Sequence, residues 1–395
     1  GGHEPKNNRT WKARRPAAVV TFTSFMVKVL SPKLLLRGFE IFILISLLGY
    51  GAVLVYGNNL QGFLDSLGRI EFVWLLVGLG LASMDWIGGG LRLWVVAREI
   101  HPRPPLGGMI LAGGMSAWAA YLTPLQSGAG PMMIYTMKRF GVSVPVAMTS
   151  TLMTFIATVA FFAIAGPLTI LFGAGRSLGQ KGNLLGLSLY DLFLGSLTIF
   201  AGLGVLLVTV IFFPRLVRDL LTRVAERLGG KSQRVAQRLE RLRAGLDEAH
   251  ASVTAFKSPK GFLALVMATI LSGPSHANKL LAGYVALRAV GIEANFVDVL
   301  LVQTLITFLL YFAPTPGASG IAELLSAAVM SVYLPRGLAP LYTLVWRMIL
   351  SYYTIAFGFF VFSYWVRKGL RGMTETMSVA AEDPMISPVG TVGES

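Results

Sequence analysis

The sequence predicts an all-α polytopic membrane protein, on the basis of its composition and its long apolar runs. Of its 395 residues, 54% are hydrophobic and only 13% are charged, whereas an average soluble domain carries about 25% charged residues. A helix needs roughly 20 apolar residues to cross a bilayer core of about 30 Å. Runs of that order occur at 39–57, 70–97, 145–172, 188–213, 261–287 and 340–366. None of them alternates like a barrel strand, so we expect helices.

Basic residues orient these helices. Lys and Arg are frequent at 6–15, 28–37, 98–103, 138–139, 214–260 and 367–371, and sparse in the other connections. Because cytoplasmic loops are enriched in Lys and Arg, we expect these segments and both termini to lie in the cytoplasm, with the chain in a cell's inner membrane. We attribute the net charge of +15 to this topology and to anionic lipid, and expect no nucleic-acid partner.

Apolar residues follow the basic N-terminus, which loosely imitates a signal peptide. Lys28, Pro32 and Lys33 stand where a cleavage site would be needed, so we expect 1–38 to be an interfacial segment. The rest is divided by composition. The expected parts are a first membrane half (39–213, with repeat 1 at about 70–172), a cytoplasmic segment (214–260), a second membrane half with repeat 2 (261–366), and a basic, disordered cytoplasmic tail (367–395).

Two apolar regions are too interrupted to be full crossings. Residues 106–135 are broken at 123–128 (TPLQSG), and residues 297–333 are broken at 314–320 (PTPGASG). Proline removes an amide donor and glycine relaxes the backbone. Such backbone survives at membrane depth only inside protein or beside a watery cavity. We therefore expect two re-entrant helical hairpins.

The two breaks resemble each other. Y-x-x-P-x-x-S-x-x-G from 121 to 130 recurs as Y-x-x-P-x-x-G-x-x-G from 311 to 320. Spanning helices flank each hairpin, and by the charge pattern the first enters from the cytoplasm and the second from outside. This arrangement predicts inverted-topology repeats with a binding site at the midplane. Chance recurrence in a glycine-rich chain is the alternative.

Segment 214–260 carries Leu and Val at intervals of three and four residues with Arg and Lys between them. This pattern predicts basic amphipathic helices that lie on the anionic leaflet or brace the bundle. A regulatory or partner-binding role is the alternative. The chain has no cysteine, its four histidines are scattered, and Gly229-Gly230-Lys231-Ser232 lacks the upstream glycine of a P-loop. We expect no metal site and no cofactor.

The candidate site consists of ionisable residues at membrane depth, which are costly there and often functional. Asp85 and Arg92 lie two turns apart on one helix face, as an internal ion pair or as part of a site. His276, Asn278 and Lys279 follow a Gly-Pro break in 261–287. Lys279 is read either as a phosphate contact or as a snorkelling side chain, and His276 as a satisfied imidazole or a proton carrier.

Two further ionisable residues accompany the second break. Glu323 follows the break and Arg347 lies in mid-helix, so they either pair across the core or flank a polar path. The half-helices after the breaks would offer free amides and positive dipole ends to an anion. The residues involved are Ser127, Gly128, Gly130, Gly317 and Gly320.

The second break also carries a family resemblance. Residues 314–323 (PTPGASGIAE) resemble the P-x-P-G-G-x-G-x-x-E signature of the lysylphosphatidylglycerol synthase/flippase transmembrane-region family, which includes AglD-like and YbhN-like proteins. Arg347 and Tyr352 stand where that family tends to carry an arginine and a tyrosine. The first break, through Gly130, is similar to the family's upstream Pro/Gly element. The resemblance covers roughly 35–370, and Ala318 replaces the second glycine of the signature.

The resemblance implies movement of a lipid between leaflets. The family's best-known members also carry a cytosolic aminoacyl-transferase domain, for which we find no residues here, so we expect no aminoacylation of lipid. Our first hypothesis is a lipid flippase, not an enzyme, with Lys279 and Arg347 receiving a phosphate and Glu323 an amine. The expected partners are a phospholipid or another anionic or zwitterionic lipid, and the anionic leaflet through 214–260; a homo-oligomer is left open. The alternatives are a membrane enzyme or partner subunit acting on a lipid-linked substrate, with Asp85, His276 and Glu323 as its acids and bases, and a scaffold.

Overall fold

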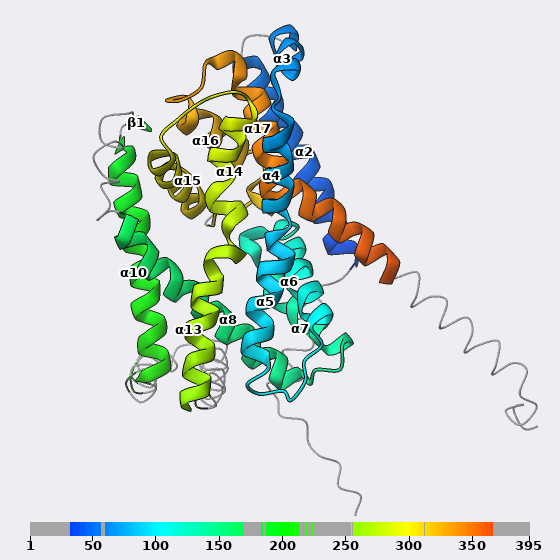
Figure 1. Cartoon of the computed structure of the whole chain (residues 1–395), viewed down its shortest axis with the longest axis vertical. Coiled ribbons are helices and arrows are strands. Elements are labelled where there is room, and N and C mark those ends of the chain that lie inside the picture. The colour runs from blue at the N-terminus through cyan, green and yellow to red at the C-terminus, as the bar shows by residue number, and fades with distance from the viewer. Residues whose placement is uncertain are drawn as a thin grey trace, which may run out of the picture.

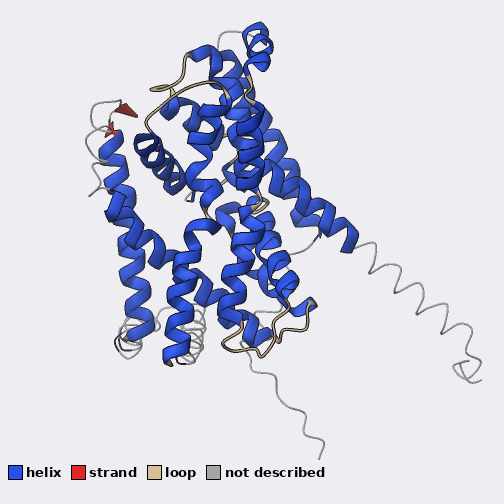
Figure 2. Ribbon diagram, in the orientation of Figure 1, coloured by secondary structure: helices blue, strands red, loops and turns tan. Residues whose placement is uncertain are grey.

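The computed structural model describes residues 32–56, 60–169, 183–184, 187–213, 256–311 and 313–365, with isolated positions between 214 and 255. These parts are helical (Figure 2), apart from the two-residue strands β1 (Asn183–Leu184) and β2 (Leu187–Ser188), which pair antiparallel. The predicted all-α class is confirmed. Residues 1–31 of the expected N-terminal segment 1–38, nearly all of 214–255 in the expected segment 214–260, and the whole expected tail 367–395 lie outside the described residues.

The first half of the chain forms a series of helices. They are α2 (Pro32–Tyr56), α3 (Leu60–Ser66), η1 (Leu67–Arg69), α4 (Phe72–Ala82), α5 (Met84–Ala97), α6 (Leu106–Tyr121), η2 (Pro124–Gln126), α7 (Ala129–Arg139), α8 (Val144–Thr169) and α10 (Leu189–Phe212).

From α4 to α8 the first half contains a divided helix, a broken hairpin and a long helix, and the second half has the same order. Its elements are α13 (Pro259–Ser275), α14 (Ala277–Ala289), α15 (Phe296–Tyr311), η4 (Pro316–Ala318), α16 (Ile321–Met330), η5 (Arg336–Leu338), α17 (Ala339–Arg347) and the π-helical turn η6 (Met348–Tyr352), after which the helix continues to Trp365.

Within the described residues, four helices are long and apolar enough to cross a membrane: Lys33–Val55, Phe72–Ala97, Val144–Leu168 and Arg336–Trp365. Large apolar side chains on the outside agree with a lipid surround, since Leu47 is 64% exposed, Phe72 69% and Phe262 67%. The expected crossings at 188–213 and 261–287 are not among these four. The expected crossing at 188–213 corresponds to α10, and the expected crossing at 261–287 is divided into α13 and α14.

Three helix boundaries add detail to the expected runs. α2 begins at Pro32, so 32–38 is part of the first helix, because proline suits a helix's first position. The helix at 261–287 divides at His276, two residues after Pro274, which lacks the amide that a continuous helix needs. The helix at 70–97 divides at Ser83.

The two divided helices pack against each other half by half. α5 contacts α13, and α4 contacts α14, in the lower and upper halves of Figure 1 respectively. Glycine permits the close approach of α5 and α13, because a Cβ on Gly88 would stand 2.8 Å from the Cα of Ser275. In lipid, small residues at such contacts let backbones approach and gain van der Waals contact.

The two broken hairpins meet at their breaks. α6 packs on α7, α15 packs on α16, and the turns η2 and η4 contact each other. In Figure 1 the first hairpin approaches this meeting point from below and the second from above. The second break is mostly buried at this contact, whereas Pro124, Leu125 and Ser127 of the first break are exposed.

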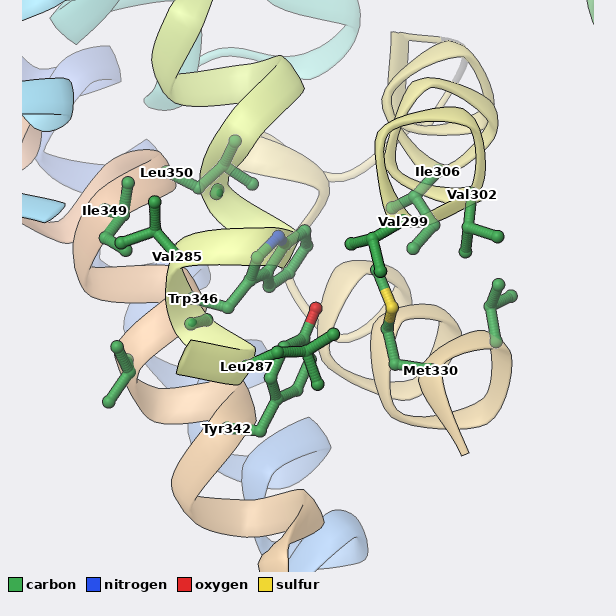
Figure 3. Packing of buried hydrophobic residues seen from close by; sticks show 14 of the residues in the cluster. Val285, Leu287, Val299, Val302, Ile306, Met330, Tyr342, Trp346, Ile349 and Leu350 are labelled. Atoms are coloured by element: carbon green, nitrogen blue, oxygen red, sulfur yellow. The ribbon is translucent and has the colours of Figure 1, made fainter. Parts of the chain in front are cut away.

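The largest apolar cluster surrounds the second hairpin (Figure 3). Trp346 of α17 lies among side chains of α14 and α15, and its Nε1 donates to Gln303 Oε1 at 3.0 Å. Because lipid tails are as apolar as these side chains, close packing stabilises the cluster more than removal from water does. The cluster holds α14, α15, α16 and α17 together.

Candidate functional site

Asp85 and Lys279 form a buried ion pair at the centre of the molecule. Lys279 Nζ lies 2.6 Å from Asp85 Oδ1, and the side chains are 14% and 3% exposed. The two residues stand just after the divisions of their helices, at Ser83 and His276. The pairing of Asp85 with Arg92 that we considered from the sequence is wrong, since Asp85 turns to α14 instead.

Three further donors hold the Asp85 carboxylate. Its Oδ2 accepts from Asn278 Nδ2 at 2.9 Å, from Tyr121 OH at 3.0 Å and from Thr354 Oγ1 at 3.3 Å. A carboxylate buried in membrane protein needs such partners. The donors come from the first hairpin and from the second half of the chain, so this one group links both halves.

The backbone of Lys279 is also held. Its carbonyl oxygen accepts from Gln303 Nε2 at 2.9 Å and from Thr307 Oγ1 at 3.0 Å. Gln303 and Thr307 are one helical turn apart on α15, so they present to the same face. The second hairpin therefore fixes the position from which the Lys279 side chain extends.

A small cavity of about 40 Å³ lies where the two breaks meet. Thr123 and Gln126 line it from the first break, and Thr315 and Gly317 from the second. Lys279 is the only Lys, Arg, Asp or Glu among its lining residues. The others are Tyr121, Leu125, Thr307, Leu310, Tyr311, Ala313, Ala318 and Leu350. The site thus combines one cation with several hydroxyl groups.

The two breaks begin with the same backbone turn and diverge at the following serine, where ψ is −21° at Ser127 and 143° at Ser319. Thr123 and Thr315 are extended, and each precedes a proline that starts a single 3-10 turn. In that turn the amide two residues after each proline donates to the threonine carbonyl, at 3.3 Å in the first break and 3.0 Å in the second. The next amide donates to the proline carbonyl at 3.1 and 3.0 Å.

The repeated unit is Thr-Pro-x-x-Ser-Gly, at 123–128 and 315–320. The expected match of Pro124 with Pro314 is therefore shifted, because Pro124 corresponds to Pro316. The connection from Tyr311 to its turn is longer than that from Tyr121, and an ungapped comparison that begins at the tyrosines misses the difference.

Both breaks contain residues in the left-handed region. Leu125 and Gln126 have φ of 50° and 55°, and Gly317 and Ala318 both have φ of 55°. A Cβ on Gly317 would stand 2.8 Å from the ring of Phe42 and 2.9 Å from the carbonyl oxygen of Tyr121. The tight approach that the family signature implies therefore lies at Gly317, and Ala318 does not interfere with it.

Replacement of Ala318 by glycine is expected to stabilise the protein by up to about 1 kcal/mol, since glycine adopts positive φ without the clash that other residues suffer. Ala322→Gly, in the following helix, is the control and is expected to destabilise it by about 0.5–1 kcal/mol. Thermal unfolding in detergent measures both. Equal losses for the two variants would mean that Ala318 is not strained.

Glu323 and Arg347 form a second buried ion pair. Arg347 Nε lies 2.9 Å from Glu323 Oε1, with side chains 1% and 0% exposed. Ser46 Oγ of α2 donates to the same carboxylate oxygen at 2.7 Å. Arg347 Nη1 donates to the Gly317 carbonyl at 3.2 Å. This pair fixes the second break to α2 and α17, and neither of its members lines the cavity.

One amide at each half-helix N-terminus is bound within the chain. The Gly128 amide donates to Thr123 Oγ1 at 2.8 Å, and the Gly320 amide donates to Glu323 Oε2 at 2.7 Å. Ser127, Gly128, Gly130 and Gly320 do not line the cavity, whereas Gly317 does. Side chains of the chain itself therefore hold one amide at each terminus, since an open donor at membrane depth is costly.

Two other predicted residues lie outside the cavity. His276 Nδ1 lies 2.8 Å from the Ser272 carbonyl, and its ring packs edge-on against Phe162. Arg92 contacts the hydroxyls of Thr158 and Ser272. Neither residue lines the cavity. His276 is still one helical turn from Lys279, whose amide donates to the His276 carbonyl at 2.9 Å, and Asn278 is linked to Lys279 through Asp85.

Several site residues were missed by the sequence analysis. Tyr121 appeared only as a repeat marker, yet it binds Asp85 and lines the cavity. Gln303 and Thr307 were read as part of an apolar hairpin. Two polar residues spaced by four on an apolar helix share one face, and that spacing could have identified them. Nothing local marks Ser46 or Thr354.

Comparisons with known proteins agree with this picture. The family model described as the lysylphosphatidylglycerol synthase TM region matches residues 39–358. A protein described as a UPF0104 membrane protein from Archaeoglobus fulgidus is 25% identical over 293 residues, which make up 73% of this chain and 86% of that relative. No solved structure matches the chain.

Proposed function

The chain belongs to the lysylphosphatidylglycerol synthase transmembrane-region family, and on that premise we propose that it moves an anionic or zwitterionic membrane lipid between leaflets. The observation that carries the proposal is the cavity shared by the two breaks, with Lys279 on its wall. The charge pattern further favours an inner-membrane location with cytoplasmic termini. In this proposal the two hairpins are re-entrant and belong to inverted repeats.

The repeated backbone supports the inverted repeats. Each half orders a divided helix, a broken hairpin and a long helix, and both breaks carry Thr-Pro-x-x-Ser-Gly with the same turn. The helix contacts also correspond between the two halves. The contact of α5 with α6 corresponds to that of α14 with α15, and the contact of α4 with α14 corresponds to that of α13 with α5. Transporters with such repeats bind substrate at the repeat interface, near the midplane.

The chemistry of the cavity supports a phosphate-bearing head group. Lys279 supplies the positive charge to the cavity wall. Thr123, Thr307 and Thr315 also line the cavity, and their hydroxyls, which donate to backbone carbonyls in this structure, would have to turn to donate to a phosphate. An arriving phosphate would compete with Asp85 for the ammonium. Asp85 keeps Asn278, Tyr121 and Thr354 as partners, so it remains hydrogen-bonded when Lys279 turns away. Rocking of one half against the other would then open the cavity to either leaflet.

A leaflet-exchange assay tests the proposal. The purified protein is placed in liposomes with fluorescent phospholipids, and a membrane-impermeant quencher reports the outer leaflet. We expect quenching well beyond half of the signal. Leu310→Trp, which fills the cavity wall, should remove most of the exchange. Leu324→Trp, on a side chain 49% exposed on α16, should leave it intact. Quenching that stops at half across several head groups, with folded protein, would contradict transport of those lipids and favour turnover of a lipid-linked substrate.

A further inference from the structure

Arg92 is a buried cation whose hydrogen bonding is incomplete. The residue is 8% exposed. Its Nη1 donates to Thr158 Oγ1 and, at 3.1 Å, to Ser272 Oγ. Both hydroxyls spend their own hydrogens on helix carbonyls, Thr158 on Thr154 O at 3.0 Å and Ser272 on Ala268 O at 2.9 Å. The hydroxyls are thus fixed as acceptors and hold the guanidinium in one orientation.

The remaining donors of Arg92 lie on one edge of the guanidinium. Nε is buried and has no hydrogen-bond partner, and no bond from Nη2 is formed within the described part of the chain. Nε–H and the adjacent Nη2–H are parallel, the arrangement with which arginine binds both oxygens of a carboxylate or phosphate. The edge of the guanidinium that has no hydrogen bonds is therefore the edge that can bind an oxyanion through two parallel hydrogen bonds.

No carboxylate forms an ion pair with this guanidinium in the described part of the chain, although the Asp85 carboxylate acts on it from a longer distance. Among the described residues, no Asp or Glu lies within 4 Å of Arg92, whereas Lys279, Arg288 and Arg347 each have one. Asp85, two turns along the same helix, is taken by Lys279. His276 lies near Arg92, and the charged groups that act on it are two cations, Arg92 and Lys279. An unpaired buried charge carries a desolvation penalty of several kcal/mol, which an anion would offset.

We propose that the Nε–Nη2 edge of Arg92 binds a phosphate-type oxyanion, at a site separate from the cavity between the breaks. Arg92 belongs to α5, and its guanidinium is held in position by Thr158 of α8 and Ser272 of α13. The occupant is the phosphate of a lipid head group or free phosphate. Because Nε is covered, the anion enters with a small movement of the side chains around that edge. The site does not depend on lipid transport.

The test is thermal unfolding of the purified protein in detergent, titrated with sodium phosphate against sodium chloride at equal ionic strength. The wild type should show a saturable rise in melting temperature with phosphate. Arg92→Met should lose this rise and, since it removes an uncompensated charge, melt higher than the wild type in chloride alone. Arg98→Gln, an exposed arginine near the end of the same helix that stacks on Trp94, should keep the wild-type rise.

Two further arms complete the test. Micelles doped with phosphatidylglycerol replace free phosphate: stabilisation that is lost in Arg92→Met identifies the occupant as a lipid, and stabilisation by phosphate alone identifies a free ion. Lys279→Gln should keep the phosphate response, which separates this site from the cavity. If Arg92→Met does not fold, Arg92→Lys should retain the charge but lose most of the phosphate affinity. The proposal would be overturned by equal shifts of melting temperature in the wild type and Arg92→Lys. It would also be overturned if neither phosphate nor phosphatidylglycerol stabilised the wild type.

Discussion

Lipid exchange is expected to fall by about 10- to 100-fold when Lys279 is replaced by glutamine, because a hydrogen bond to a charged group is worth about 1.5–3 kcal/mol. Lys279 is the cation on the cavity wall. The single variant also leaves Asp85, whose side chain is 3% exposed, without its counterion. Breaking one partner of a buried pair destabilises by about 3–5 kcal/mol, so the single variant alone is ambiguous.

The double variant Asp85→Asn with Lys279→Gln resolves the ambiguity. It removes both charges and can keep hydrogen bonds to Tyr121 and Asn278. We expect it to recover most of the melting temperature that either single variant loses, while exchange in the liposome assay remains lost. If the double variant exchanged lipid at the wild-type rate, the pair would only brace the two halves, and the assignment of Lys279 to the substrate would fail.

The second large effect is on stability. Arg347→Ala should destabilise the protein by about 3–5 kcal/mol, because it leaves a fully buried carboxylate unpaired. It also frees the Gly317 carbonyl that Arg347 holds at the second break. Unfolding of the detergent-solubilised protein, followed by tryptophan fluorescence, measures the change.

The matched control is another arginine–glutamate pair. Arg288 Nη1 lies 2.8 Å from Glu293 Oε1, but the side chains are 25% and 86% exposed. Exposed pairs contribute about 0–1 kcal/mol, so Arg288→Ala should change stability little. Glu323→Gln with Arg347→Met, which removes both buried charges, should recover most of the loss. Equal effects of Arg347→Ala and Arg288→Ala would show that the buried pair does not hold the second break.

The sequence predicted the breaks because their cause is local. Proline and glycine at 123–128 and 315–320 change the backbone of their own segment, and the structure has turns there. Even so, the match between the breaks was misplaced by the longer connection after Tyr311. The sequence also placed a Gly-Pro break within 261–287, and the structure divides the helix there, at His276; whether a proline kinks or divides a helix depends on its surroundings.

The sequence by itself determined the helical membrane class, because length and apolarity of a run decide whether it suits a bilayer. It also identified Asp85, Lys279, Glu323 and Arg347, because charge is rare among apolar residues at that depth. Only the tertiary structure decided how they combine. Asp85 pairs with Lys279, and Arg92 has no carboxylate within ion-pair distance among the described residues, although Arg92 is the nearer to Asp85 in sequence. The physical reason is that an ion pair forms between groups that folding brings within a few ångströms, and the crossing of the two divided helices sets that distance.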